Sequence, residues 1–265
     1  MKKKVVNIGN GKYNINFIGD VHFPRGKYNL FRNEIQKLAK DQTQYMIGLG
    51  DWVESILPKD PRYNPEETVF FIQKYKLDVS DVGTQYAYIE EALQPIAEEN
   101  RILGLHNGNH EQATNKRISN NELSKICGRL GTEYYGDGAA ITILQGKHDK
   151  KINILSAHGV GGGLTPGFAI NKLEQHSNIF ANIDIIAEGH THRLSMDISE
   201  NQLDIGGEEI KHKVQWHLSC GSFLGNYDLG YASYAELKMY KPTALGYMRA
   251  EIEDGEIRNV KAIVV

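Results

Sequence analysis

The sequence predicts an α/β protein that contains a largely parallel sheet. Up to His192, short apolar runs alternate with segments of helical periodicity, a pattern typical of parallel strands connected by helices. Several of these runs end at a glycine or small residue that is followed by a carboxylate, amide or imidazole side chain. In open α/β sheets such positions, at the carboxyl ends of strands, form the ligand site.

The expected elements follow in chain order. Asn10-Gly11 lies between two strand-like runs in the segment 5–18 and predicts a β-hairpin, because both residues tolerate positive φ. Apolar residues at helical spacing predict helices over 30–40, 86–99, 123–130 and 169–180. Single strands are expected at 45–49, 101–105, 183–187 and 214–218, and hairpins from 140–144 with 152–156 and from 247–252 with 257–264.

The segment at about 55–100 differs from its surroundings. Pro58 and Pro61 interrupt its start, and Pro65 suits the first turn of a helix. Its aromatic side chains include Phe70, Phe71, Tyr75, Tyr86 and Tyr88. Two interpretations are open: helices that cover one face of the sheet, or a helical, cap-like segment over the site that binds a ring.

Composition narrows the class of protein. The 265 residues contain 40% hydrophobic and 24% charged residues, with no repeat and no linker, so residues 1–265 are expected to form one domain. The net charge of −3 argues against an evenly basic nucleic-acid surface. Cys127 and Cys220 lie far apart, which excludes a disulfide framework and a thiolate zinc site. No apolar run resembles a membrane span or a signal peptide, so a cytoplasmic protein without a membrane partner is expected.

Short polar motifs follow the apolar runs. They are Asp20-Val21-His22, Gly50-Asp51, Gly108-Asn109-His110-Glu111, Ala157-His158-Gly159 and Gly189-His190-Thr191-His192. Any one of these histidines taken alone is more often a hydrogen-bonded core or surface residue than a ligand. Together they supply nitrogen and oxygen donors without sulfur, which suits divalent ions such as Mn, Fe, Zn or Ni. They are too many for one tetrahedral ion and suit two ions about 3.5–4 Å apart that share a carboxylate.

This motif series, from Gly19 to His192, resembles that of the calcineurin-like metallophosphoesterases. The resemblance implies an α/β fold, a four-layer α/β/β/α sandwich of two mixed β-sheets flanked by helices. It also implies two divalent metal ions, with Mn expected and Fe, Zn, Ni or Mg as alternatives. Carried over by motif, Asp20, His22 and His192 correspond to ligands of the first metal, Asn109, His158 and His190 to ligands of the second, and Asp51 to the bridging carboxylate.

The resemblance further implies that a metal-bridging hydroxide attacks phosphorus while His110 assists the leaving group. Glu54 lies three residues after Asp51, where many family members carry an acid. We expect its carboxylate to orient His110, the alternative being a solvated surface acid. Ser55 stands where the phosphoprotein phosphatases of the family carry an arginine, so Arg25 is a second candidate for binding phosphate, against a solvated arginine.

The expected function is therefore that of a two-metal-ion phosphoester hydrolase, a phosphodiesterase or phosphatase. Its partner would be a phosphorylated small molecule or a nucleotide. A nuclease of the DNA-repair type, acting on DNA or RNA ends, is the alternative, which makes nucleic acid a second candidate partner. A non-catalytic metal-binding interaction scaffold is a lesser alternative. The motifs leave the oligomeric state and the choice between monoesters and diesters open.

Overall fold

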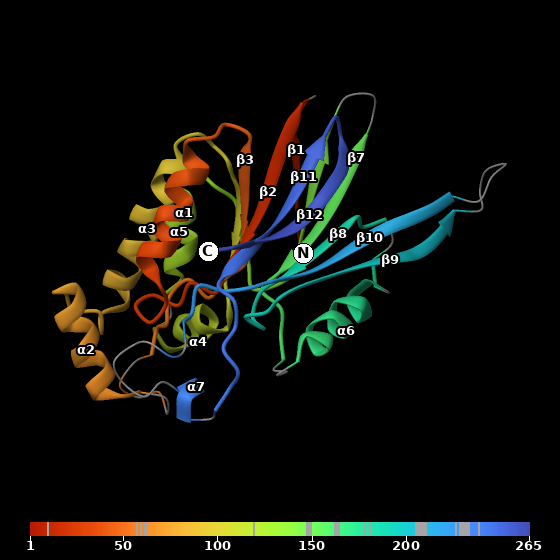
Figure 1. The fold of residues 1–265 in the computed structure, drawn as a ribbon. Coiled ribbons are helices and arrows are strands. Elements are labelled where there is room, and N and C mark those ends of the chain that lie inside the picture. The colour runs from red at the N-terminus through yellow and green to blue at the C-terminus, as the bar shows by residue number, and fades with distance from the viewer. Residues whose placement is uncertain are drawn as a thin grey trace.

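The computed structural model describes residues 1–9, 11–56, 58, 60, 63–118, 120–146, 150–161, 165–177, 179–180, 182–204, 211–225, 227, 234–237 and 239–265. Within these residues the chain forms two six-stranded mixed sheets (Figure 1). The first sheet has the order β1 (Lys2–Asn7), β6 (Ala140–Gln145), β7 (Lys151–Ala157), β8 (Ile185–Glu188), β10 (Lys211–Cys220), β9 (Leu194–Asp204). The second has the order β12 (Glu256–Val264), β11 (Gly246–Glu253), β2 (Lys12–Ile18), β3 (Gln44–Gly48), β4 (Ile102–His106), β5 (Tyr134–Gly136).

Helices flank the two sheets. They are α1 (Tyr28–Ala39), α2 (Pro65–Tyr75), α3 (Val82–Ala97), α4 (Asn109–Ile118), α5 (Glu122–Arg129), α6 (Pro166–Ser177) and the short α7 (Tyr234–Leu237). In Figure 1, α1, α3 and α5 lie together beside β3, whereas α6 lies beside β8, β9 and β10. The expected four-layer α/β/β/α sandwich of two mixed β-sheets is therefore confirmed.

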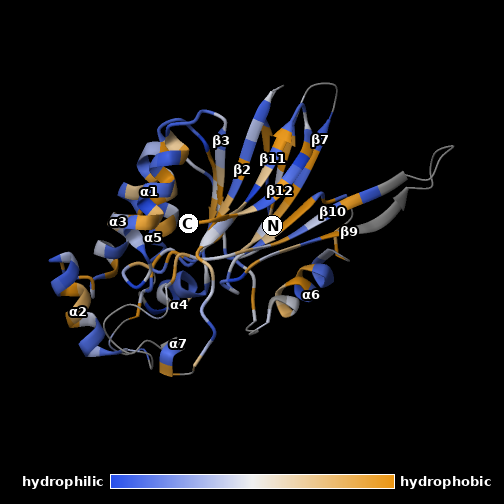
Figure 2. Cartoon of the chain, viewed as in Figure 1, coloured by the Kyte–Doolittle hydropathy of each residue, from blue (hydrophilic) through white to orange (hydrophobic). Residues whose placement is uncertain are grey.

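The apolar pattern of the strands explains this arrangement. Phe17 and Ile47 of the second sheet and Ile154 and Ile185 of the first are fully buried in one cluster between the sheets. The interior strand β4 is buried along its whole length, as expected for a parallel strand covered on both faces. Figure 2 shows hydrophobic residues concentrated along the strands and on the sheet-facing sides of the helices. Burial of these faces is the main force that holds the layers together.

The hairpin expected at 5–18 is wrong. β1 pairs in parallel with β6, while β2 pairs with β3 and β11 in the other sheet, so the chain crosses between sheets at this point. Asn10 itself lies outside the described residues. The Asn-Gly signal is local, whereas the partner of each strand edge is decided by packing between distant segments. The hairpins β6–β7 and β11–β12 are confirmed, and β9 was not predicted.

The segment 55–100 divides into two parts. α3 belongs to the helical layer, and its Tyr86, Ile89 and Leu93 are buried against the second sheet. α2 lies below this layer in Figure 1 and packs against it, with its buried Phe71 in the same apolar cluster. Its N-terminus is formed as the sequence predicts, with Pro65 in the first turn and Asn64 accepting hydrogen bonds from two backbone amides. The first interpretation, a helix that covers one face of the sheet, therefore describes α3 but not α2.

No described helix combines the length and apolarity that a bilayer span requires.

Candidate metal centre

The polar motifs converge at one end of the sheets. They follow the carboxyl ends of β2, β3 and β4 in one sheet and of β7 and β8 in the other, and the neighbouring strands of each group are parallel. Because parallel strands end at the same edge, side chains far apart in the sequence meet there. His22 and His192, which are 170 positions apart, approach to 3.1 Å between their Nε2 atoms.

Backbone hydrogen bonds hold the first two motifs side by side. The amide of Asp20 donates to the carbonyl of Gly50 at 2.8 Å, and the amide of His22 donates to the carbonyl of Asp51 at 3.0 Å. The φ angles of Asp20, His22 and Asp51 are 51°, 51° and 50°, in the left-handed region that non-glycine residues seldom adopt. His190 and His192 share this feature, with φ angles of 65° and 56°. Strain of this kind clusters at functional sites.

The first cluster contains Asp20, His22 and His192. Asp20 Oδ1 lies 3.2 Å from His192 Nε2 and 3.7 Å from His22 Nε2. The carboxyl group of Asp20 is fully buried, and its Oδ2 accepts a hydrogen bond from the backbone amide of His190. The residues expected to hold the first metal therefore face one another, each presenting one donor atom to a common point.

The second cluster contains Asn109, His158 and His190. Asn109 Oδ1 lies 3.0 Å from His158 Nε2 and 2.9 Å from His190 Nδ1, and the two ring nitrogens are 3.2 Å apart. His158 Nδ1 is held by a hydrogen bond to the carbonyl of Leu49 at 2.8 Å, which leaves Nε2 as its donor atom. The residues expected to hold the second metal are therefore also brought together.

Asp51 lies between the two clusters. Its Oδ2 is 3.3 Å from His158 Nε2 and 3.7 Å from His22 Nε2, so one carboxylate oxygen approaches both groups. Its Oδ1 accepts a hydrogen bond from the backbone amide of His110 at 3.0 Å. This is the position that a bridging carboxylate requires.

The donor set fits divalent cations. Asp20 Oδ1 is buried and receives no hydrogen bond of acceptable geometry from any residue that the structure describes. Buried oxygens are rarely left in this state, and here two imidazole nitrogens, those of His22 and His192, face it as well. A cation would use the lone pairs of all three atoms. Nitrogen and oxygen donors without sulfur suit Mn, Fe, Zn or Ni, and the structure does not choose among them.

The electrostatics of the site also favour bound positive charge. Burial opposes ionisation of Asp20, but the nearby imidazoles of His192 and His22 lower the pKa of its carboxyl group well below the usual range. Burial likewise opposes ionisation of Asp51, and the charges of His158 and His110 lower its pKa. Burial lowers the pKa of His158, but the Asp51 carboxylate outweighs this effect and raises it to about 9. The neighbouring histidines thus stabilise the ionised form of both carboxyl groups.

Glu54 and His110 are adjacent, but not in the way expected. His110 Nδ1 lies 2.6 Å from the backbone carbonyl oxygen of Glu54, and the Glu54 carboxylate is 3.9 Å from that nitrogen. The carboxylate instead accepts hydrogen bonds from His22 Nδ1 at 2.9 Å and from Arg25 at 3.1 Å. Glu54 therefore orients His110 through its main chain and His22 through its side chain. It is buried, so it is not the solvated surface acid of the alternative interpretation.

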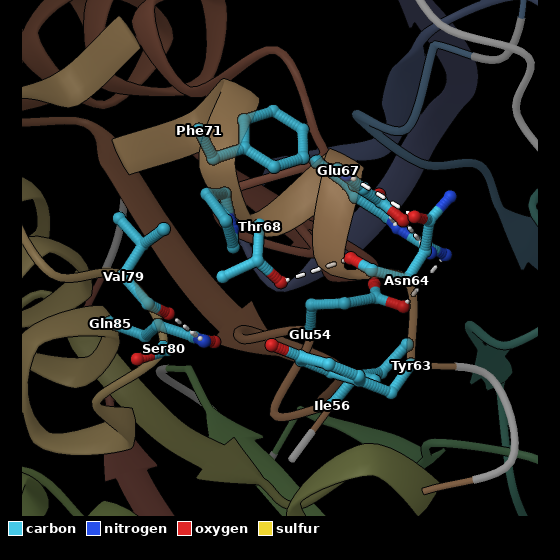
Figure 3. A pocket seen from close by; sticks show the side chains of 12 residues that line it. Glu54, Ile56, Tyr63, Asn64, Glu67, Thr68, Phe71, Val79, Ser80 and Gln85 are labelled. Carbon is cyan, nitrogen blue, oxygen red and sulfur yellow. Dashed lines mark hydrogen bonds and ion pairs between the residues drawn. The ribbon is translucent and has the colours of Figure 1, made fainter. Parts of the chain in front are cut away.

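Arg25 forms ion pairs with Glu54 and with Glu67 of α2, so it is not the solvated arginine of the alternative interpretation, and its binding of phosphate stays a prediction. These three residues border a small pocket together with Tyr63, and Figure 3 shows Glu54, Tyr63 and Glu67 around it. No pattern in the sequence could have identified the contact of Arg25 with Glu67, because 42 positions separate them.

Glu111 is the residue of the candidate site that sequence reasoning missed. Its carboxylate is fully buried and accepts hydrogen bonds from the backbone amides of Asp51, Trp52, Val53 and Gly108. It thereby joins the loop after β3 to the loop after β4. Its place in the motif, directly after His110, could have identified it as a residue of the site, but spacing alone assigned it no role.

Solved structures similar to this chain include two described as phosphate-ester enzymes. A predicted phosphoesterase from Streptococcus pneumoniae is 13% identical, with a TM-score of 0.39 and coverage of 96% of this chain and 98% of that one. A novel phosphatase from Mycoplasma pneumoniae is 14% identical, with a TM-score of 0.46 and coverage of 97% and 94%. Vps29 from Chaetomium thermophilum is 10% identical, with a TM-score of 0.42 and coverage of 96% and 95%. No family model and no curated protein sequence matches the chain.

Proposed function

We propose that this chain is a metal-dependent phosphoester hydrolase. One observation supports the proposal above all: two clusters of nitrogen and oxygen donors lie on either side of the Asp51 carboxylate, at the carboxyl ends of the parallel strands. In this assignment Asp20, His22 and His192 hold one cation and Asn109, His158 and His190 hold the other. Two bound divalent cations would lower the pKa of a water molecule and neutralise charge on phosphoryl oxygens.

Main-chain and side-chain groups of the protein hold His110 in position for the reaction. The Glu54 carbonyl holds the His110 ring by Nδ1, so we assign proton transfer to the leaving oxygen to Nε2. The His110 backbone amide binds Asp51 Oδ1, which ties the position of this acid to that of the bridging carboxylate. The His22 and His110 rings are in edge contact, with centroids 4.8 Å apart. A proton donor and the first cluster therefore border the same space.

The test is a screen of nucleotides, cyclic nucleotides, a nitrophenyl phosphodiester, and single- and double-stranded nucleic acids with Mn²⁺. We expect metal-dependent hydrolysis of a phosphorylated small molecule that is lost on chelation and in Asp51→Asn. His110→Ala should retain bound metal and lower kcat by about 10²–10⁴-fold, the usual contribution of a general acid. Bound metal without hydrolysis of any of these compounds would contradict the proposal and favour a scaffold.

The screen also separates the two substrate classes. Cleavage of nucleic acid that falls steeply with rising salt would identify a nuclease, because phosphate contacts release counterions. The net charge of −3 favours the small-molecule class. A cap function for α2 and a cytoplasmic location are further predictions that accompany this proposal.

A further inference from the structure

We infer that Arg25 and Glu67 are positioning residues for His22, and that they connect α2 to the first metal cluster. The inference rests on the proposed function, because His22 binds a metal only under that proposal, and Arg25 and Glu67 do not reach a metal themselves. Successive side-chain contacts, here called a chain of contacts, connect Glu67 through Arg25 and Glu54 to the imidazole of His22.

The contacts are specific at every step. The guanidinium of Arg25 donates to both carboxylate oxygens of Glu67, from Nε to Oε1 and from Nη2 to Oε2. Its Nη1 donates to Glu54 Oε1 at 3.1 Å. The other oxygen of Glu54 lies 2.9 Å from His22 Nδ1. A planar guanidinium with several donors can hold two carboxylates in fixed orientations, which lysine cannot do.

The chain of contacts is shielded from solvent. The side chains of Glu54 and Glu67 are 8% and 9% exposed, and that of Arg25 is 20% exposed. Ion pairs in such surroundings are screened less than surface pairs, and removing one partner leaves a buried charge without compensation. Glu67 lies in the first turn of α2, which begins at the Asn64 cap, so its position follows that of the helix. Figure 3 shows Asn64, Glu67 and Glu54 on the same side of the pocket.

These contacts determine from which histidine the Glu54 carboxylate accepts a hydrogen bond. Two imidazoles are near it: His22 Nδ1 is 2.9 Å from Oε2, whereas His110 Nδ1 is 3.9 Å from Oε1. Arg25 occupies Oε1 and thereby keeps the carboxylate turned toward His22. With Nδ1 held by the Glu54 carboxylate, the His22 ring directs its Nε2 toward Asp20 and His192. Without the ion pair to Arg25, Oε1 is available to His110 and the orientation of His22 is lost.

The experiment is a Co²⁺ titration of the metal-free protein, followed by the visible absorption of the bound ion and by calorimetry. The variants are Glu67→Gln and Arg25→Lys, and the matched control is Glu66→Gln. Glu66 also lies in the first turn of α2, but its side chain is exposed, so this variant reproduces the change of charge at the helix N-terminus. Thermal unfolding of each metal-free variant verifies that it is folded.

We expect wild type and Glu66→Gln to bind two Co²⁺ ions with the same affinities and spectrum. Glu67→Gln and Arg25→Lys should weaken one of the two sites by about 3–30-fold and alter its absorption bands, a smaller loss than the 10–100-fold typical of groups that contact a ligand directly. A loss of packing alone would not affect one site selectively. Two sites with unchanged affinity and spectrum in both variants would overturn the inference, whereas a wild type that binds no Co²⁺ would overturn the proposed function itself.

Discussion

The buried carboxylate of Glu111 accepts a hydrogen bond of 2.9 Å from the backbone amide of Asp51. The same carboxylate accepts a hydrogen bond of 2.6 Å from the amide of Gly108, directly before Asn109 and His110 at the start of α4. A single side chain thus sets the distance between the proposed bridging carboxylate and the second cluster. Its contribution is positional, because its oxygens are already used by main-chain donors.

We predict that Glu111→Gln lowers both stability and metal affinity. Glutamine has one acceptor oxygen, so some of the amides that Glu111 binds would be buried without a partner, at a cost of about 2–4 kcal/mol. Urea unfolding of the metal-free protein measures the loss of stability, and the control is Glu99→Gln, which changes an exposed acid just after α3. A variant as stable as this control would show that water or rearrangement satisfies the amides.

Gly108→Ala should abolish metal binding. A Cβ at this position would lie 2.0 Å from Asp51 Oδ1 and 2.3 Å from the Asp51 amide nitrogen, so the bridging carboxylate would be displaced. A Cβ on Gly128 of α5 would meet no described atom within 4 Å beyond its chain neighbours and its own helix backbone, so Gly128→Ala should keep the wild-type metal content. Elemental analysis of the purified variants measures bound metal. Equal metal content in the two variants would contradict the assigned role of Asp51.

Removal of metal should lower the thermal stability of the wild type. Cations that bind the native state and not the unfolded chain stabilise it, by about 2.7 kcal/mol per site at a free concentration of 100 times Kd. Scanning calorimetry with Mn²⁺ and with chelator measures the difference in Tm. In Asp51→Asn the difference should shrink, because the carboxylate shared by both clusters is lost. An identical Tm with and without metal in the wild type would argue against the site.

His176 should make stability depend on pH. Its hydrogen bond to Glu188 raises its pKa, and burial opposes this effect. A histidine whose pKa is higher in the folded state adds stability that is fully present below its unfolded pKa, about 6.5, and is lost as pH rises through the folded pKa. The free energy of unfolding of wild type minus that of His176→Gln, measured in chelator, should therefore fall from pH 6 upward.

The size of this effect is limited by solvent. The His176 side chain is 28% exposed, so we expect a change of less than about 1 kcal/mol. The subtraction removes the contributions of the histidines in the metal clusters, which are common to both proteins. A difference that stays constant between pH 6 and pH 8.5 would show that the Glu188 contact does not stabilise the charged imidazole.

The proximity of the candidate ligands could be predicted because each motif is local. Asp20-Val21-His22 follows β2 and His190-Thr191-His192 follows β8, so each motif could be placed at a strand end, and the resemblance of the whole motif series implied that the two share one site. The two strands belong to different sheets, so the contact itself depends on how the sheets pack. Hairpins with short connections, such as β11–β12 around Asp254-Gly255, were predictable for the same reason. The pairing of β1 with β6 was not, because 138 positions separate the paired Lys2 and Ala140.

The Glu54–His110 relationship shows where spacing stops being informative. The resemblance implied that the two residues lie near each other, but it could not distinguish the main-chain carbonyl of Glu54 from its carboxylate. That choice depends on Arg25, which lies before α1, and on Glu67, which lies in α2. Both contacts bring together segments that carry no common pattern.

The sequence by itself determined the α/β class, the donor atoms available for metal ions and the strand ends that present them. These follow from hydrophobic periodicity and from residue type, which act over a few neighbouring positions. The tertiary structure alone decided how the strands pair, that Asp51 approaches both clusters, and that the Glu54 carboxylate serves His22. Distances between segments remote in the chain depend on packing of the whole fold, and hydrogen bonds and ion pairs are set by those distances.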